Sequence, residues 1–592
     1  MIYEKFIRVL YINCDTKKIR IEQREDLQAY LGGVGVASKL LEENMKVGFD
    51  PLDPAQPIIF AVGAATTIFP VITKTVAMFI SPLTGELGES YAGGRLAMCL
   101  FYAGYDAVVI TGMLKEPGYI NISAHDVAFK DARAIWGTDA DGAGNLIRAR
   151  EGGGNGKRSI IRIGPAGENQ VHYASVCVDT YRHFGRLGLG ACFGSKNLKA
   201  IQVVGDRQIP AQNQKEYFKV YQDIYKKVTS TDIMGKYHDL GTSIKVEPLS
   251  NAGGLPTLNL QKTTFDKADQ IGGEQFAQKH LVRKMACTGC PVGCIHIGQI
   301  RREFDKGHEY EKRDVCYDYE LIFALGSYLG IDNTQEILEV IDDVERAGLD
   351  AMSTGVCLGW ATEAFKTGLI SENDTLIPLE FGNAETYKQA IWNISSRKNY
   401  FWSALANGCA YAAKQYGGSD YAMSIAGNET PGYHTGYGSL IGAAVGARHS
   451  HLCNGGYSVD QGLKDFDPID FDKEGLVDKL FKEEKERCML NSLIICLFAR
   501  KVYDRGTIIS ALNSIGASLS DSDLSDIAGR TLCTKLRIKR KLNFQLKEIV
   551  FPKRFFETPS LVGKLDESVT KELLEIYQRK CDELEAQYAL EQ

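Results

Sequence analysis

An α+β fold is predicted by two observations on this chain of 592 residues. Short apolar runs closed by glycine or serine crowd the first third and are typical of strands. After residue 208 the apolar residues recur at helical spacing instead. Strands and helices that are segregated along a chain favour α+β over an alternating α/β architecture. We therefore expect a strand-rich N-terminal domain of packed β-sheets over 1–208, followed by two mainly α-helical domains over 209–425 and 426–592.

The predicted strands begin with a hairpin, IRVLYINCDTKKIRIEQ, whose turn lies at Asp15–Lys18. Further apolar runs of strand length lie at 58–63, 76–81, 106–112, 159–164 and 200–205. The longest apolar stretch, 57–72, is shorter than the roughly 20 residues of a membrane-spanning helix and is interrupted by Gly63 and Pro70. We interpret this stretch as buried strands and expect no membrane span.

The predicted helices are few in the first third, where only 28–45 and 144–151 have a helical pattern. Later segments carry apolar residues at the spacing of one helix face, at 214–228, 335–349, 388–396 and 569–590. Asn333 precedes the second of these and is a candidate N-cap.

The composition narrows the class of protein. Charged residues make up 24% and hydrophobic residues 44%, as in globular proteins, and the length predicts roughly two to four domains. The net charge of −6 gives no general electrostatic reason to bind nucleic acid. The N-terminus has no apolar segment followed by a cleavage site, so we read no signal peptide. Fifteen cysteines without an export signal indicate a reducing, cytoplasmic location.

A cysteine motif, CTGCPVGC, places Cys287, Cys290 and Cys294 within eight residues. One loop can thereby set three thiolates around one inorganic centre, either a structural zinc or a 4Fe-4S cluster. Structural zinc sites usually combine two Cys-x-x-Cys motifs, and this chain has no second such pair. The spacing therefore favours the 4Fe-4S cluster over zinc and over unliganded core thiols. Spacing alone does not identify a fourth ligand among Cys316, Cys357, Cys409, Cys453, Cys488, Cys496, Cys533 and Cys581.

Glycine-rich stretches let the backbone approach a ligand closely, with amides facing phosphates or a flat heterocycle. One of them, GLGACFG at 188–194, superficially matches a nicotinamide-dinucleotide fingerprint. Only a few residues separate it from the next predicted strand, whereas a βαβ unit needs about thirty. We therefore reject the dinucleotide interpretation.

Several stretches in one order resemble the aldehyde:ferredoxin oxidoreductase family, tungsten or molybdenum enzymes with a bis-pyranopterin cofactor. The resemblance covers nearly the whole chain. It rests on 81–94 (SPLTGELGESYAGG), 103–112, 163–175, 185–201 (GRLGLGACFGSKNLKAI), 253–261, 287–294, 324–333, 345–355 and 491–498. The resemblance implies that the cofactor is buried between the domains and that Cys496 is the fourth cluster ligand.

The resemblance also implies the residues that hold the cofactor. The segments matching those that bind the pterins and a bridging magnesium contain Lys74, Tyr91, Gly93, Gly94, Arg186, Leu187 and Gly188. The two segments matching the pterin-ring sites contain Glu345, Leu349 and Asp350, and Asn491, Leu493 and Ile495. The chain departs from the family at four of these positions, which usually hold Asp for Glu345 and Asn491, Asn for Tyr91, and Arg for Lys74.

For proton transfer the resemblance implies His451 with Glu320 and Asp318, because a buried His–carboxylate pair can relay a proton near neutral pH. A competing alignment uses Glu309 and Glu311, and His449 is a second histidine candidate. Arg448 is either a ligand for an acidic substrate or a salt-bridge partner.

The function implied is oxidation of a small-molecule aldehyde to the carboxylic acid, with electrons passed through a 4Fe-4S cluster to ferredoxin or an iron–sulfur subunit. A reductase acting on an acid, thioester or ring substrate is the alternative within the family. A third hypothesis is an electron-transfer subunit that holds the cluster alone. A homodimer is a common assembly in the family.

Overall fold

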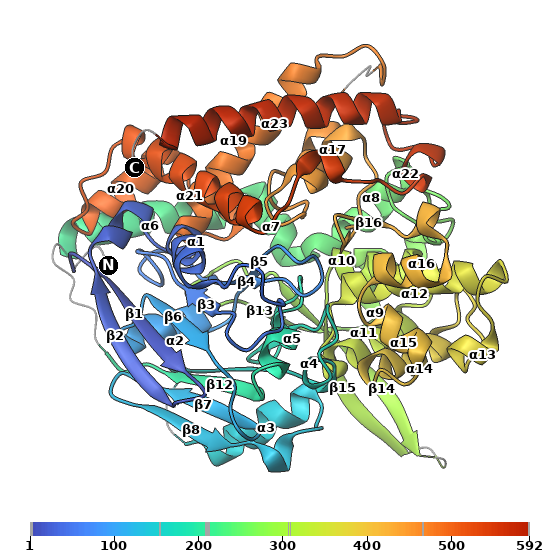
Figure 1. Ribbon diagram of the computed structural model, residues 1–592, viewed down its shortest axis with the longest axis horizontal. Coiled ribbons are helices and arrows are strands. Elements are labelled where there is room, and N and C mark those ends of the chain that lie inside the picture. The colour runs from blue at the N-terminus through green and yellow to red at the C-terminus, as the bar shows by residue number, and fades with distance from the viewer. Residues whose placement is uncertain are drawn as a thin grey trace.

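Two six-stranded sheets make up the N-terminal third of the computed structural model, which describes residues 4–152, 156–207, 214–305, 307, 309–463 and 467–589 (Figure 1). The first sheet has the order β2 (Lys18–Arg24), β1 (Ile7–Asn13), β6 (Ala107–Thr111), β3 (Ile58–Ala61), β4 (Thr75–Ile80), β5 (Leu87–Ala92). The second has the order β11 (Arg182–Phe184), β10 (Val176–Val178), β9 (Arg158–Arg162), β12 (Leu198–Val204), β7 (Gly118–Ile122), β8 (Val127–Asp131). The predicted hairpin is confirmed, since β1 and β2 pair antiparallel from Ile7↔Arg24 to Asn13↔Lys18.

Alternation of side chains along the strands explains how these sheets pack. On β3, Ile58 and Phe60 join a buried cluster that also contains Ile161 of β9 and Ile201 of β12, so one face of each sheet meets the other. The intervening Ile59 points to the opposite face, into a cluster shared with α1 (Gly33–Asn44). Both faces of this strand are therefore buried, which is why its sequence is apolar at every position.

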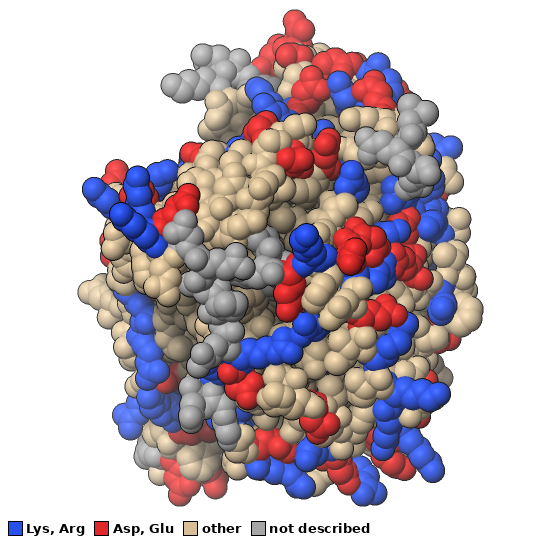
Figure 2. All heavy atoms as spheres, turned by 90° about the vertical axis from the view of Figure 1, so that its left-hand side faces the viewer, with Lys and Arg blue, Asp and Glu red and all other residues tan. Residues whose placement is uncertain are grey.

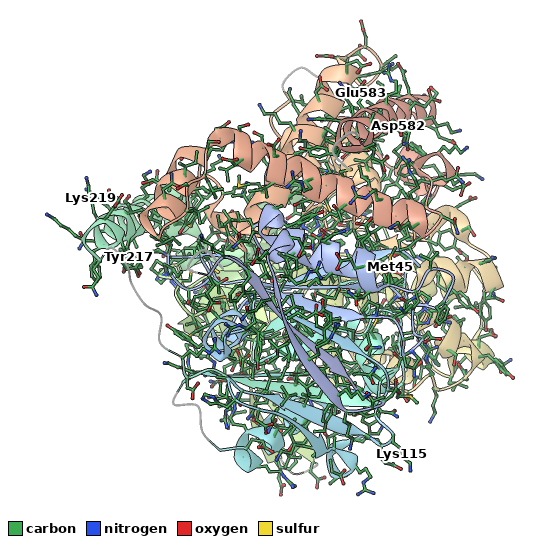
Figure 3. The ribbon with its side chains drawn as sticks, turned by 60° about the vertical axis from the view of Figure 1, so that its left-hand side comes forward. Met45, Lys115, Tyr217, Lys219, Asp582 and Glu583 are labelled. Carbon is green, nitrogen blue, oxygen red and sulfur yellow. The ribbon has the colours of Figure 1, made fainter. Side chains whose placement is uncertain are left out.

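Helices dominate after the second sheet, as predicted. The predicted helical segments are found as α6 (Gln214–Ser230), α11 (Thr334–Ala347), α14 (Ala384–Ser395) and α23 (Glu567–Ala589). Asn333 caps α11, its side-chain oxygen accepting a bond from the Gln335 amide at 2.9 Å. In Figure 3 the side chains of Asp582 and Glu583 mark α23 at the top, while Lys115 lies at the opposite end beside the sheets. The boundaries of the two helical domains stay a prediction.

A third sheet was not anticipated from the sequence. It comprises β13 (Leu281–Met285), β14 (Ile295–Asp305) and β15 (Glu309–Tyr317), and its hairpin projects at the lower right of Figure 1. Apolar residues alternate with polar ones at the start of β14, in IHIGQI, and β15 ends in the buried residues Val315–Tyr317, but most of the hairpin between them is charged. The cysteine motif is the connection between β13 and β14.

The apolar stretch 57–72 is only partly a strand. β3 ends at Ala61, and the remainder is a buried loop in which Thr67 and Val71 take positive φ values of 62° and 67°. In the part of the chain that the structure describes, no helix is both long and apolar enough to span a membrane. One face of the molecule shows Lys and Arg interspersed with Asp and Glu (Figure 2).

Candidate active site

The cysteine motif meets two distant segments of the chain. The Val71 amide donates to the Gly289 carbonyl at 3.0 Å, and the Cys496 amide donates to the Val71 carbonyl at 3.2 Å. Ile72 and Ile495 form an antiparallel bridge beside these bonds. The loop after β3 thus connects the motif to Cys496, two hundred residues further along the chain.

Burial separates four cysteines from the others. Cys287, Cys290, Cys294 and Cys496 are partly accessible, whereas the remaining cysteines are all buried. Burial raises the pKa of Cys290 to about 12, and nearby Cys496 adds to that rise. Cys496 likewise raises the pKa of Cys294, after burial, to about 11. The four thiols therefore lie close enough to interact and retain surface for a ligand.

The spacing of these sulfurs bears on which centre they fit. Among the described residues, one group of three or more Cys, His, Asp or Glu has its ligand atoms within 4.8 Å of one another, and it contains none of these four cysteines. A tetrahedral zinc with Zn–S bonds of about 2.3 Å needs sulfurs about 3.8 Å apart. No three of these four sulfurs are thus gathered as closely as one tetrahedral zinc requires.

Two cations face the thiols. Burial alone would lower the pKa of Lys74, but the Cys496 and Cys287 sulfurs outweigh it and raise that pKa. Arg182 lies beside the same group, with Nη2 3.0 Å from the Cys316 sulfur. A Cβ atom at Gly93 would lie 2.5 Å from the Cys287 sulfur and 3.2 Å from Lys74 Nζ, so only glycine fits between them.

Arg186 anchors the second predicted binding segment. Its Nε donates to Asp350 at 3.0 Å, and its Nη2 donates to the Asn428 side chain and the Glu429 carbonyl at 2.7 Å each. Its Nη1 is buried without a hydrogen-bond partner in the described structure. A buried guanidinium nitrogen with an open donor fits an anionic group of a bound cofactor.

The two residues after Arg186 have left-handed backbone conformations, with positive φ angles. Leu187 has φ 73° and its carbonyl accepts from Ser81 Oγ at 2.8 Å. Gly188 has φ 87°, and a Cβ there would lie 2.0 Å from the His172 carbonyl. Packing alone therefore requires glycine at position 188, whatever the segment binds.

The two carboxylates of the first predicted pterin-ring segment, Asp350 and Glu345, differ in their surroundings. Asp350 caps α12 (Ala351–Lys366) through the Met352 and Ser353 amides and also pairs with Arg186, so its oxygens already have partners. Glu345 lines a polar cavity of ≈ 230 Å³. Burial and the carboxylates of Asp141 and Asp342 raise the pKa of Glu345 well above its ordinary value.

The second predicted pterin-ring segment, with Asn491, Leu493 and Ile495, lies at the end of α19 (Lys473–Ser492). Asn491 and Leu493 are buried there, and the following Ile494 accepts from the Lys74 amide at 3.4 Å. Leu349 and Ile495 are likewise buried. On the sheet side, Gly94 has φ 98° and its carbonyl accepts from the Thr288 amide of the cysteine motif at 3.1 Å. The structure thus brings the Gly93–Gly94 turn, the motif and the 491–496 segment together.

His451 and Glu320 form a buried pair, with His451 Nε2 3.2 Å from Glu320 Oε1. Burial raises the pKa of Glu320 to about 7. Burial, followed by the charges of Arg186 and Lys245, lowers the pKa of His451 well below its ordinary range. The second ring nitrogen, Nδ1, and Glu320 Oε1 are both buried without a hydrogen-bond partner in the described structure, so the 3.2 Å contact is a close approach and not an aligned hydrogen bond. The pair is thus a neutral imidazole with one open nitrogen beside a carboxyl that titrates near neutrality.

Asp318, predicted together with Glu320, and the competing candidates Glu309 and Glu311 have other contacts in the structure. Asp318 caps the helix that carries Glu320, α10 (Tyr319–Ile322), by accepting from the Glu320 and Leu321 amides. Glu309 and Glu311 lie on the β15 hairpin strand, where Glu309 is exposed and Glu311 is paired in register with Arg302. The geometry therefore favours Glu320 over both of them.

His449 and Arg448 belong to buried ionic networks. Glu86 Oε2 lies 2.8 Å from Lys539 Nζ and 3.3 Å from His449 Nε2. Arg448 Nε lies 3.7 Å from Glu89 Oε1, and its guanidinium sits 4.7 Å from the centre of the Tyr91 ring. Tyr91 in turn donates to Glu89 at 2.6 Å. These contacts support a salt-bridge role for Arg448.

Removing the Glu86 carboxylate will destabilise the fold, because Lys539 would be left buried without its counter-charge. Burial alone would raise the pKa of Glu86, but Lys539 and His449 outweigh it and lower that pKa to about 2 from 4.5. The stabilisation is therefore present above pH 4.5 and is lost as pH falls toward 2. We expect Glu86→Gln to cost about 3–5 kcal/mol at pH 7, measured by chemical unfolding.

The difference in unfolding free energy between wild type and Glu86→Gln will shrink between pH 4.5 and 2. Glu583→Gln, at an exposed position of α23, is the control and will change stability by less than about 0.5 kcal/mol. A constant difference across that pH range would show that the ion pair does not stabilise the protein.

Three residues beside the His451–Glu320 pair were missed from the sequence. The rings of Tyr433 and Tyr457 stack with centres 4.2 Å apart, and His451 lies against both, at 5.3 and 5.7 Å. Lys245 Nζ lies 5.7 and 5.2 Å from the same two ring centres. No motif marks these residues, because Lys245 lies nearly two hundred positions before the two tyrosines in the sequence.

A buried group of Cys357, Cys409 and Glu429 has ligand atoms within 4.8 Å of one another. Glu429 accepts from Ser353 Oγ at 2.7 Å, from the Cys409 amide at 3.1 Å and from the Cys357 sulfur at 3.6 Å. Both carboxylate oxygens are thus already hydrogen-bonded, and the group is a polar network of the core.

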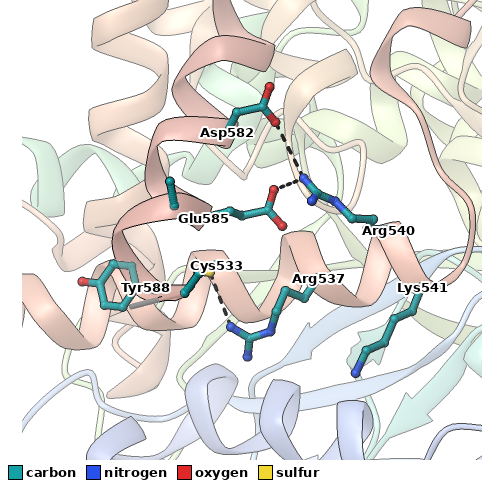
Figure 4. A pocket seen from close by; sticks show the side chains of 9 residues that line it. Cys533, Arg537, Arg540, Lys541, Asp582, Glu585 and Tyr588 are labelled. Carbon is teal, nitrogen blue, oxygen red and sulfur yellow. Dashed lines mark hydrogen bonds and ion pairs between the residues drawn. The ribbon is translucent and has the colours of Figure 1, made fainter. Parts of the chain in front are cut away.

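A surface pocket of ≈ 700 Å³ between α21 (Asp521–Lys541) and α23 contains none of the predicted site residues (Figure 4). Its charged side chains pair with each other, as Arg540 does with Asp582 at 3.6 Å and with Glu585. Cys533 in this pocket interacts with Arg537 Nη1 at 3.4 Å. This thiol is therefore a suitable control for the four clustered cysteines.

Comparison with known proteins identifies the family of the chain. The profile described as "Aldehyde ferredoxin oxidoreductase, N-terminal domain" matches residues 9–205, and that described as "Aldehyde ferredoxin oxidoreductase, domains 2 & 3" matches residues 219–582. Both describe a class of oxidoreductases. The chain belongs to the aldehyde ferredoxin oxidoreductase family, which confirms the resemblance and the α+β fold expected from it.

The chain is similar to tungsten-containing aldehyde ferredoxin oxidoreductases of Pyrococcus furiosus and Thermococcus kodakarensis. Each is 30% identical over 580 residues, covering 95% of this chain and 93% of the relative. The WOR-like subunit of an aliphatic sulfonate oxidoreductase of Pyrococcus furiosus is 28% identical over 424 residues, 69% of this chain and 66% of that protein.

Among solved structures, the active-site complex BamBC of benzoyl coenzyme A reductase with 1,5-dienoyl-CoA has the same fold. Its TM-score is 0.81 at 19% identity, with 97% of this chain and 94% of that chain covered.

Proposed function

We propose that this protein oxidises an aldehyde to its carboxylic acid, using a tungsten bis-pyranopterin and a 4Fe-4S cluster. The observation that carries the proposal is the His451–Glu320 pair, found in a chain that also gathers the four cysteines. The similarity to tungsten-containing aldehyde ferredoxin oxidoreductases over 95% of the chain supports both the metal and the substrate class. Ferredoxin, or an iron–sulfur subunit, is the proposed electron acceptor.

The residues present fit the two groups. Cys287, Cys290, Cys294 and Cys496 would hold the cluster, with Lys74 beside it. Arg186, with its open Nη1 donor, and the Gly93–Gly94 turn would hold the pterin side together with a magnesium ion. When bound, the tungsten centre would supply a two-electron acceptor and the cluster a one-electron path to ferredoxin.

The reaction consumes one aldehyde and one water and releases the carboxylic acid, two protons and two electrons. The protein must therefore move protons where the substrate reacts. The open Nδ1 of His451 can accept a proton, and Nε2 can pass one to Glu320 Oε1, 3.2 Å away, once the ring and the carboxyl align to form a hydrogen bond. Because the pKa of Glu320 is raised to about 7, this carboxyl can both accept and release a proton near neutral pH.

A reductase is the second candidate function. The fold of a benzoyl coenzyme A reductase complex matches this chain throughout, and that protein was solved with a dienoyl-CoA. The same buried acid–imidazole pair could supply protons to a substrate that is being reduced. The direction of electron flow distinguishes the two functions.

Aldehyde-dependent reduction of a viologen dye tests the proposal on anaerobically prepared, tungsten-loaded protein. We expect turnover with small aldehydes. Tungsten-loaded protein that is inactive with aldehydes but reduces an acid, thioester or unsaturated ring with reduced ferredoxin would replace the first function with the second.

All the cysteines are free thiols, which supports a reducing, cytoplasmic location.

Arg186→Lys tests the cofactor assignment without removing the charge. Lysine lacks the planar guanidinium group of arginine, which contacts Asp350 and Asn428 at the same time and keeps Nη1 free for a bound ligand. We expect the purified variant to retain about half or less of the tungsten per chain, on the scale of one lost charged hydrogen bond. The iron content should be unchanged.

The matched control is Arg24→Lys, because Arg24 pairs with Glu43 at 3.0 Å on the edge strand β2, outside the predicted binding segments. It should keep wild-type tungsten. Equal tungsten in all three proteins would remove Arg186 from the binding site.

A further inference from the structure

Lys245 carries an unusual positive charge beside the His451–Glu320 pair. It ends the short helix Gly241–Lys245, immediately before α8 (Val246–Asn251). Its ammonium group lies 5.2 Å from the ring centre of Tyr457, and the His451 ring lies 5.7 Å from the same centre. The lysine and the histidine therefore both contact the Tyr457 ring.

This ammonium group has no carboxylate within 4.0 Å among the residues that the structure describes. Two buried lysines differ from it, since Lys535 and Lys539 each contact a glutamate within 3 Å. Lys245 contacts the faces of two tyrosine rings, which attract a cation but leave its hydrogen-bond donors open. A partly buried ammonium with open donors is a site for an anionic group.

Solvent exposure differs between the residues of this site. Lys245 and Tyr457 are partly exposed, whereas Tyr433 and His451 retain only 9% and 7% of their accessible surface. An extended molecule with one end at Lys245 would cross the stacked tyrosine rings before its other end reaches His451. The charged end would lie on the outer side and the reacting end on the buried side.

We propose that Lys245 determines substrate specificity by binding a carboxylate at the far end of the aldehyde. The aliphatic part would lie on the Tyr433 and Tyr457 rings, with the aldehyde group at His451 and Glu320. A singly charged carboxylate matches one ammonium group, whereas a phosphate would call for more cations than this position offers. The proposal rests on the proposed aldehyde oxidation and adds the substrate class to it.

The test compares two aldehydes of equal chain length, succinic semialdehyde and butanal, on tungsten-loaded protein. The measured quantity is the ratio of their kcat/KM values. Loss of a hydrogen bond to a charged group corresponds to about a 10- to 100-fold change. We expect Lys245→Met to lower the ratio by that factor, mainly through KM for succinic semialdehyde, and Lys245→Arg to restore most of it.

The control is Lys219→Met, because Lys219 lies exposed on α6 and points away from the molecule (Figure 3). It should keep the wild-type ratio. A ratio that is equal in wild type and Lys245→Met would overturn the proposal.

A binding measurement separates this proposal from the proposed function. Succinate, which has no aldehyde to oxidise, is titrated into wild type and Lys245→Met and followed by calorimetry. We expect about tenfold weaker binding or more in the variant. Failure of all aldehyde turnover would end the proposed function, while equal succinate binding by both proteins would end the role of Lys245.

Discussion

Cys287→Ser will remove most of the iron from the purified protein, together with the visible absorption of the cluster. The serine hydroxyl is a poor ligand for iron in a cubane, which is held by thiolates. Cys496→Ser is expected to have the same effect, although it lies two hundred residues away, because the loop after β3 bonds both segments. Iron per chain, measured on anaerobically prepared protein, gives the result.

Cys533→Ser is the matched control, since its thiol lies between α21 and α23 in contact with Arg537. It should keep all of its iron. If Cys287→Ser and Cys533→Ser contain equal iron, the four cysteines are not the ligands.

His451→Ala will lower turnover by about two to four orders of magnitude, the usual scale of acid–base catalysis, while tungsten and iron stay bound. The reason is the loss of the imidazole that pairs with Glu320 at 3.2 Å and keeps one nitrogen open. Turnover per bound tungsten measures the effect. A wild-type rate in this variant would assign His451 a purely structural role.

The pH dependence gives a second signature of the same pair. Glu320 is neutral below its pKa of about 7 and ionised above it, so a rate that needs the base will rise as pH passes through 7. Asp318 raises the pKa of Glu320 further, whereas the Gly432 amide, Lys245 and Arg186 act to lower it. Glu320→Gln should be slow and should lose this inflection, and an unchanged profile in that variant would exclude Glu320 as the titrating group.

Local signals in the sequence predicted much of the fold. The β1–β2 hairpin could be predicted because its turn separates two runs of strand-forming residues. Helix α11 could be predicted because Asn333 precedes a helical pattern of apolar residues. The β14–β15 hairpin was missed because charged residues hide its alternation along most of its length. Its stability comes from pairing between strands, which no single segment displays.

The candidate site divides in the same way. Three thiols in one loop indicate an inorganic centre from spacing alone, but Cys496 could be assigned only through the family resemblance. Its approach depends on the Val71 backbone, which carries no side-chain signal. The role of Lys245 could not be predicted from the sequence for a related reason. It depends on Tyr433, Tyr457 and His451, which lie nearly two hundred residues or more further along the chain.

Elemental analysis of anaerobically prepared protein tests most directly whether the chain holds a tungsten or molybdenum centre beside an iron–sulfur cubane. We predict about four irons and one tungsten or molybdenum per chain, and no stoichiometric zinc. One zinc per chain without iron would contradict the cluster assignment. Iron without tungsten or molybdenum would contradict the enzyme assignment and favour an electron-transfer subunit.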